Sequence, residues 1–133
     1  GQLAYALAAE TFSGPRWDAL VARGARPQRP LWASTSAKNP AYPDTLYVDE
    51  LIGPGTVNTL PDATLEAFED HGTVGRTIDA DLDAARAVID GLAGVGVDLA
   101  DVTATLEAEG VAAFEKSFVE LLAVLDAKAG SLR

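Results

Sequence analysis

The chain has 133 residues, a net charge of −10 from 10 basic and 20 acidic side chains, no cysteine and one histidine. The absence of cysteine excludes disulfides and sulfur-ligated zinc, a single histidine leaves almost no material for a Ser-His-Asp triad, and the length favours a single domain. An acidic surface repels nucleic acid, and no apolar run reaches the roughly 18 residues of a membrane helix, so we expect a cytoplasmic protein with neither partner.

The amino-terminal segment predicts two helices. Gly1 to Ser13 is rich in Ala and Leu and is typical of the tail of a helix. Because the sequence also contains no methionine, we expect it to be part of a longer chain. Pro15 favours the first turn of a second helix, and Gly24 favours its end.

Two short segments predict β-strands. Leu31 to Thr35 lacks helical periodicity, and Thr56 to Leu60 is rich in β-branched residues. Ser36 to Asp44, with two prolines and small polar residues, predicts a loop between them, and a helix from Leu46 to Ile52 follows. Strands joined by such a crossover pair in parallel. Two parallel strands leave faces and edges bare, so we expect further strands from elsewhere.

The predicted helix from Leu46 to Ile52 has two candidate capping residues. Asp44 or Thr45 can accept hydrogen bonds from its first backbone N–H groups. The glycines at Gly53 and Gly55 favour its end.

Further helices follow the second strand. The first ends near Gly72, and a helical tail covers about residues 79–128. Apolar residues recur at helical spacing from Leu82 to Leu92, and Asp79 or Asp81 suits the positive end of that helix. The glycines between Gly91 and Gly96 predict a hinge.

The end of the tail predicts a long amphipathic helix. Asp98 can cap a helix, and Gly110 is expected to interrupt it. Apolar side chains then recur at spacings of three and four residues, at Val111, Phe114, Phe118, Leu121 and Leu125. One interpretation of the whole chain is therefore a self-contained acidic helical module that binds a partner protein through the Val111 to Leu125 face.

The candidate binding residues follow the first strand. Ligands of parallel α/β folds bind at loops leaving the carboxyl ends of strands. The donors of this loop are Ser34, Thr35, Ser36 and Lys38. Residues 1–40 carry five basic and two acidic side chains, against a strongly acidic remainder. Hydroxyls beside a cation suit a phosphate or carboxylate. An ordinary polar loop with a turn at Asn39 is the alternative, and the loop from Asn58 to Asp62 is a second candidate.

The sequence offers few residues for other kinds of catalytic or binding site. A Schiff base on Lys38 would need a desolvated amine, which a polar loop does not offer. His71, at a helix end, is expected to act as a capping cation. The acidic residues from Asp79 to Asp83 lack the spacing of a calcium loop, and the glycines from Gly91 to Gly96 lack that of a dinucleotide site. We predict no metal and no cofactor.

Three motifs together resemble the transaldolase family, in its bacterial branch with a long C-terminal helical extension. They are R-P-L-W-A-S-T at Arg29 to Thr35, K-N-P-A-Y at Lys38 to Tyr42, and D-T-L-Y-V at Asp44 to Val48. The stretch T-V-N-T-L-P from Thr56 and the ending around Phe114 and Phe118 fit the same family.

The resemblance implies the C-terminal part of a TIM (β/α)₈ barrel. Leu31 to Thr35 would be its seventh strand and Thr56 to Leu60 its eighth, with additional C-terminal helices. A barrel needs about 250 residues, so residues 1–133 would be the C-terminal segment of one domain. Transaldolases transfer a dihydroxyacetone unit between sugar phosphates in the pentose phosphate pathway. They use a lysine Schiff base on the fourth strand and no cofactor, so this chain would hold no catalytic residue.

The resemblance also assigns the phosphate-binding residues. Ala33-Ser34 matches the end of the family's seventh strand, where an arginine two residues after the serine helps to hold the substrate phosphate. Here Ser36 stands at that spacing, and Lys38 brings a cation two positions later. Ser34, Ser36 and Lys38 are thus expected to bind phosphate, while an upstream segment of the same enzyme supplies the nucleophile. Altered specificity for other phosphorylated ketoses is a further interpretation.

Overall fold

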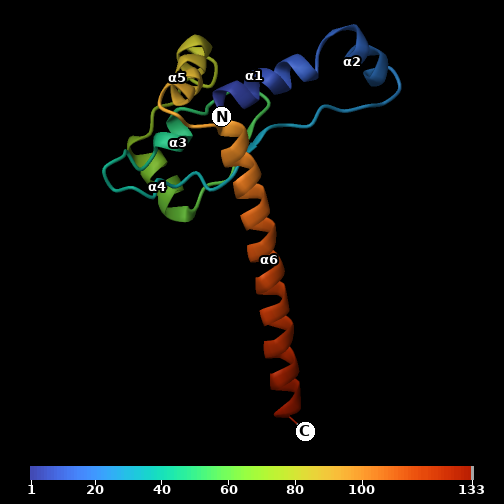
Figure 1. The fold of residues 1–133 in the computed structure, drawn as a ribbon. Helices are drawn as coiled ribbons and strands as arrows, with labels where there is room; N and C mark the ends of the chain where they lie inside the picture. Colours follow the sequence, from blue (N-terminus) through green and yellow to red (C-terminus); the bar gives the residue numbers. More distant parts are fainter. Residues whose placement is uncertain (133) are drawn as a thin grey trace. The chain divides into compact units, whose positions relative to one another are not determined.

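The computed structural model describes residues 1–132 and shows six helices and one two-stranded sheet there (Figure 1). The helices are α1 (Gln2–Thr11), α2 (Gly14–Val21), α3 (Leu46–Asp49), α4 (Asp62–His71), α5 (Leu82–Gly94) and α6 (Leu99–Gly130). The chain divides into two compact units, Gly1–Ala87 and the residues from Val88 onward. No helix in the described part of the chain has the length and apolar character to cross a membrane.

Strands β1 (Leu31–Trp32) and β2 (Val57–Asn58) pair in parallel, with Leu31 opposite Val57. The backbone N–H of Val57 donates to the Pro30 carbonyl at 2.9 Å, and that of Thr59 donates to the Trp32 carbonyl at 3.0 Å. The two predicted strands and their parallel pairing are confirmed, but both are shorter than predicted. The left-handed backbone of Ser34, with φ of 57°, ends β1 because an extended strand cannot continue through that conformation.

The two predicted amino-terminal helices form, and their proline and glycine residues lie at the expected positions. Pro15 lies in the first turn of α2, where its missing N–H costs no helical hydrogen bond. Gly24 has φ of +92°, which ends the segment in a conformation that glycine adopts without strain. The rings of Phe12 and Trp17 meet edge to face with centroids 4.8 Å apart. This contact packs the residue after α1 against α2.

Helix α3 is shorter than predicted and is not capped by a side chain. It ends at Asp49 instead of Ile52, and Thr45 occupies its N-cap position without a capping hydrogen bond. The Thr45 hydroxyl donates instead to Asp49 Oδ2 at 2.6 Å. The capping prediction is therefore wrong, because a carboxylate one turn away competes for the hydroxyl.

The core of the first unit lies beneath α3. Val48 and Ile78 are its buried apolar residues. Asp49 ties α3 to the segment after α4, since its Oδ1 accepts from the Thr73 backbone N–H at 2.8 Å and its carbonyl accepts from the Thr77 hydroxyl at 2.5 Å. These bonds place Ile78 against Gly53, where a Cβ would lie 2.2 Å from Ile78 Cγ2. Only glycine leaves the space for this approach.

The predicted helical tail is confirmed, with two corrections. Helix α5 continues through Gly91 to Gly94, so the hinge is shorter than predicted and turns at Gly96, with φ of +83°. Helix α6 passes through Gly110 unbroken (Figure 1), because a single glycine in a helix costs only about 1 kcal/mol. The Asp98 side chain caps α6 as predicted, accepting from the backbone N–H groups of Ala100 and Asp101.

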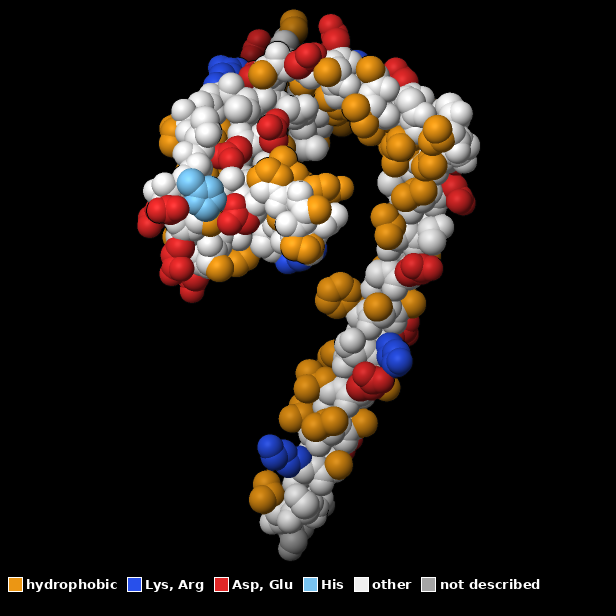
Figure 2. Space-filling model, turned by 90° about the vertical axis from the view of Figure 1, so that its left-hand side faces the viewer, with side chains coloured by type: hydrophobic (Ala, Val, Ile, Leu, Met, Phe, Trp, Pro, Cys, Tyr) orange, Lys and Arg blue, Asp and Glu red, His pale blue; other side chains and the backbone are white. Residues whose placement is uncertain are grey.

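The apolar stripe of α6 is exposed. Phe114 is 82% accessible, and the other members of the stripe are also exposed: Val111, Phe118, Leu121 and Leu125. Figure 2 shows hydrophobic side chains along this helix at its surface. Within the second unit, taken by itself, the stripe therefore does not form a core.

Candidate functional site

The candidate site lies where the chain leaves the two parallel strands. Residues from Ala33 follow β1, and residues from Thr59 follow β2. Because the strands are parallel and in register, both connections emerge at the same edge of the sheet. This edge is where ligands bind in parallel α/β folds.

Ser34 is exposed and holds a strained backbone at this edge. Its φ of 57° lies in the left-handed region, which costs a residue with a Cβ about 1–2 kcal/mol. Such strain persists where surrounding contacts enforce it, and it concentrates at functional positions. Ser34 also lines a pocket of about 410 Å³, together with Gly1, Ala4, Leu31, Trp32, Ala33, Thr35, Tyr47 and Leu51.

The structure brings Ser36 and Lys38 together. Lys38 Nζ donates to the Ser36 hydroxyl oxygen at 2.5 Å. Lys38 is exposed and Ser36 is half-buried. An ammonium group has three donors, so this contact leaves two for a ligand. The pair thus presents a positive charge and a hydroxyl on the same loop as Ser34.

Thr35 does not serve as a further donor to a ligand, contrary to the sequence-based expectation. Its side chain is buried, with the residue only 3% exposed. Its hydroxyl lies 2.8 Å from Asn58 Oδ1 and 3.1 Å from the Thr59 carbonyl oxygen. Because a buried hydroxyl needs a partner, Thr35 turns inward between its two exposed or half-buried serine neighbours.

Asn58 links both ends of the loop that carries the candidate residues. Its Oδ1 accepts from Thr35, and its Nδ2 donates to the Tyr47 carbonyl at 3.4 Å. The sequence places Asn58 only at the start of a second candidate loop. No pattern within one sequence pairs it with Thr35, which lies 23 residues away.

The far end of this loop is held by a histidine. His71 Nε2 contacts Asp44 at 2.9 Å, and Nδ1 contacts Asp70 at 3.0 Å, at an exposed surface where Figure 2 shows acidic side chains beside the ring. The hydrogen bond with Asp44, followed by that with Asp70, raises the pKa of His71 above its ordinary value. The same bond lowers the pKa of Asp44. His71 lies in the last turn of α4, the helix end that the sequence predicts for it, and its ring also binds two carboxylates, which the sequence did not predict.

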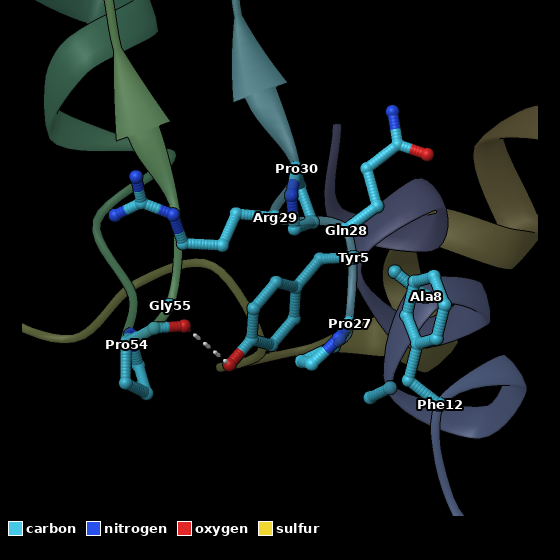
Figure 3. A pocket seen from close by; sticks show the side chains of 10 residues that line it. Tyr5, Ala8, Phe12, Pro27, Gln28, Arg29, Pro30, Pro54 and Gly55 are labelled. Carbon is cyan, nitrogen blue, oxygen red and sulfur yellow. Dashed lines mark hydrogen bonds between the residues drawn. The ribbon is translucent and has the colours of Figure 1, made fainter. Parts of the chain in front are cut away.

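A second pocket lies at the opposite end of the strands (Figure 3). Pro30 and Gly55, which precede β1 and β2, line this cavity of about 210 Å³. The Tyr5 hydroxyl donates to the Pro54 carbonyl at 3.3 Å across it. Its walls are mostly apolar. No cluster of three or more metal-ligating side chains occurs among residues 1–132.

Comparison with known proteins gives a consistent result. A family model described as Transaldolase/Fructose-6-phosphate aldolase matches residues 2–125. A transaldolase of Parafrankia sp. is 59% identical over 131 residues, which are 98% of this chain and 36% of that protein. A transaldolase of Thermobifida fusca is 60% identical over 122 residues, which are 91% of this chain and 33% of that protein. A transaldolase of Mycolicibacterium smegmatis is 54% identical over 132 residues, which are 98% and 35% of the two chains.

The chain spans about a third of the length of the curated relatives that it matches. The family match includes the Val111 to Leu125 face of α6. The interpretation of the chain as a self-contained helical interaction module is therefore not supported.

Proposed function

Because this chain belongs to the transaldolase/fructose-6-phosphate aldolase family, we propose that it forms part of an enzyme that transfers a dihydroxyacetone unit between sugar phosphates. The proposed setting is the pentose phosphate pathway in the cytoplasm. We place residues 1–133 as the C-terminal segment of a single (β/α)₈ barrel domain, with β1 and β2 as its seventh and eighth strands. Helices α5 and α6 are the additional helices.

The surfaces of the two strands support a companion segment. Leu31 in β1 is 54% exposed, although parallel strands are normally covered on both faces. Exposed strand edges are satisfied when further strands pair with them. The proposed partner is the upstream segment of the same enzyme, present in the same polypeptide or as a second chain.

The nucleophile is proposed to lie on that upstream segment. A Schiff-base lysine needs an amine that loses its charge readily, as desolvation allows. Lys38 is exposed and hydrogen-bonded to Ser36, so it lacks the desolvated surroundings that such a nucleophile requires. Its proposed role is to hold the phosphate group of the substrate, together with Ser34 and Ser36.

The observation that carries this role is the Lys38–Ser36 pair on the loop that follows the carboxyl end of β1. In (β/α)₈ barrels, phosphate sites are frequently formed by the loops after the seventh and eighth strands. The left-handed Ser34 turns the chain out of the sheet at the start of this loop. A lysine binds phosphate as a point charge, without the two-pronged geometry of arginine.

Substitution of Lys38 tests the proposal in the complete enzyme, with all the chains that it has in the cell. Lys38→Ala should raise the KM for fructose 6-phosphate about 10-fold to 100-fold, the equivalent of one charged hydrogen bond, and leave the KM for fructose unchanged. Lys116→Ala is the matched control, because Lys116 is an exposed lysine on α6. Equal effects on both ketoses, or none, would remove Lys38 from the phosphate site.

The intact mass of the enzyme isolated from its source tests the proposed companion. We expect a longer polypeptide that contains these residues, or a second polypeptide that carries the Schiff-base lysine. Full activity of a preparation containing residues 1–133 alone would contradict the proposed arrangement.

A preference for other phosphorylated ketoses is a second candidate function. The cation at Lys38, two positions beyond the family's arginine spacing, favours this candidate. A phosphate bound to Lys38 would lie at a different distance from the end of the strand. Turnover measured with ketose phosphates of different chain length separates the two candidates.

A further inference from the structure

We propose that Asn58 is a positioning residue that fixes the phosphate-binding loop in its working conformation through Thr35 and Tyr47. This inference rests on the proposed phosphate site at Ser34, Ser36 and Lys38. It assigns a role in substrate binding to a side chain that would not itself touch the substrate.

Thr35 lies between the two serines of the proposed phosphate site. Its buried hydroxyl donates toward Asn58 Oδ1 at 2.8 Å, so the side chain of Thr35 points inward. Ser34 is exposed and Ser36 is half-buried. A fixed Thr35 therefore limits where both serine hydroxyls can lie, since each is joined to it by a single peptide bond.

Asn58 also contacts the helix that follows the loop. Asn58 Nδ2 donates to the Tyr47 carbonyl in α3 at 3.4 Å. One amide thus joins the start of the loop, at Thr35, to the helix that follows the loop. Asn58 can span these points because it is paired with Trp32 in the sheet, at the carboxyl end of β1.

Position 58 requires a side chain that is both a hydrogen-bond donor and an acceptor. An amide both accepts a hydrogen bond through its oxygen and donates through its nitrogen. A carboxylate could accept from Thr35 but could not donate to the Tyr47 carbonyl, and it would bring a negative charge close to a bound phosphate. An apolar side chain would leave the buried Thr35 hydroxyl with the Thr59 carbonyl as its remaining acceptor.

The backbone of Ser34 is strained. Its φ of 57° is unfavourable for a residue with a Cβ, and such a conformation persists only where neighbouring contacts enforce it. The bond between Thr35 and Asn58 is the nearest side-chain contact to Ser34 along the chain. Loss of that bond should let Ser34 relax toward the extended region and move its hydroxyl.

The test measures KM and kcat of the complete enzyme with fructose 6-phosphate and with fructose, and inhibition by inorganic phosphate. Asn58→Ala and Thr35→Val should each raise the KM for fructose 6-phosphate about 3-fold to 10-fold, the equivalent of one neutral hydrogen bond. The inhibition constant of phosphate should rise by the same factor. kcat, and the KM for fructose, should not change.

Three further variants separate positioning from general damage. Thr35→Ser keeps the hydroxyl and should restore the wild-type KM. Thr64→Val removes the hydroxyl of another buried threonine, on α4, and should change neither KM. The double variant Thr35→Val/Asn58→Ala should be no worse than Asn58→Ala alone, because Asn58→Ala already removes the bond to Thr35.

The outcomes also separate this inference from the proposed function. If Lys38→Ala leaves the KM for fructose 6-phosphate unchanged, the proposed phosphate site itself fails. If Lys38→Ala raises that KM but Asn58→Ala and Thr35→Val do not, only the positioning role is wrong. Equal changes for fructose and fructose 6-phosphate, or additive effects in the double variant, would also overturn it. Thr35→Val is close to threonine in shape, so it keeps the test valid should Asn58→Ala fail to fold.

Discussion

Gly53 and Ile78 provide a quantitative test of the packing beneath α3. A Cβ at Gly53 would lie 2.2 Å from Ile78 Cγ2, whereas carbon atoms in contact normally lie about 3.5–4.0 Å apart. Ile78 is completely buried, so its side chain has no open space to move into. Gly53→Ala should therefore destabilise the protein by about 1–3 kcal/mol, the usual cost of overpacking a core.

A double-mutant cycle identifies the contact that causes this loss. Ile78→Ala leaves a cavity and should cost about 2–5 kcal/mol by itself. In the Ile78→Ala background, Gly53→Ala should lose most of its cost, because its methyl group enters the space that Cγ2 vacates and the remaining close atom is the Cβ of residue 78, at 3.1 Å. In an Ile78→Val background the branched carbon remains, and Gly53→Ala should keep its full cost.

Urea unfolding of the complete protein measures these free energies. Gly110→Ala is a control of opposite sign, because a Cβ there meets no other atom within 4 Å and lies inside α6. It should stabilise by about 0.5–1 kcal/mol. A Gly53→Ala protein as stable as the wild type, or a cost that does not depend on residue 78, would refute the packing argument.

Two remaining predictions concern charged side chains. The raised pKa of His71 means that its contribution to stability is complete below the ordinary value of 6.5 and is lost as the pH rises through the folded-state pKa. The lowered pKa of Asp44 means that its contribution is present above 3.8 and is lost as the pH falls through the folded-state pKa. Unfolding followed from mildly acidic to mildly basic pH should therefore show a loss of stability in the wild type that is absent in His71→Ala, and parallel curves would contradict the pairing. Asp98→Ala should cost about 1 kcal/mol and reduce helical circular dichroism, while Asp98→Asn should retain most of the cap; a loss that is equal in both would point to charge instead.

Much of the fold follows from local sequence signals. The positions of β1 and β2 follow from short β-branched or aperiodic runs between prolines, and their parallel pairing follows from the crossover between them. Gly110 shows the limit of such signals, because its neighbours in α6 are good helix formers that outweigh one glycine. The early end of β1 could not be predicted, because it depends on the left-handed backbone of Ser34 and a serine does not indicate that conformation.

Some contacts of the candidate site could be predicted from the sequence, and others could not. Ser36 and Lys38 are two residues apart, so their contact could be anticipated from the loop that contains them. The bonds from Thr35 to Asn58 and from Asp44 to His71 join residues 23 and 27 positions apart. Such pairs depend on how the strands and helices pack, and no periodicity within one sequence encodes them.

The most direct test of the central claim is a structure of the complete enzyme with fructose 6-phosphate bound. We predict that phosphate oxygens lie within hydrogen-bond distance, about 2.7–3.2 Å, of Lys38 Nζ and of the hydroxyl of Ser34 or Ser36, at the carboxyl end of β1. A phosphate bound elsewhere, such as beside Tyr5 and Arg29 at the opposite end of the strands, would contradict the account.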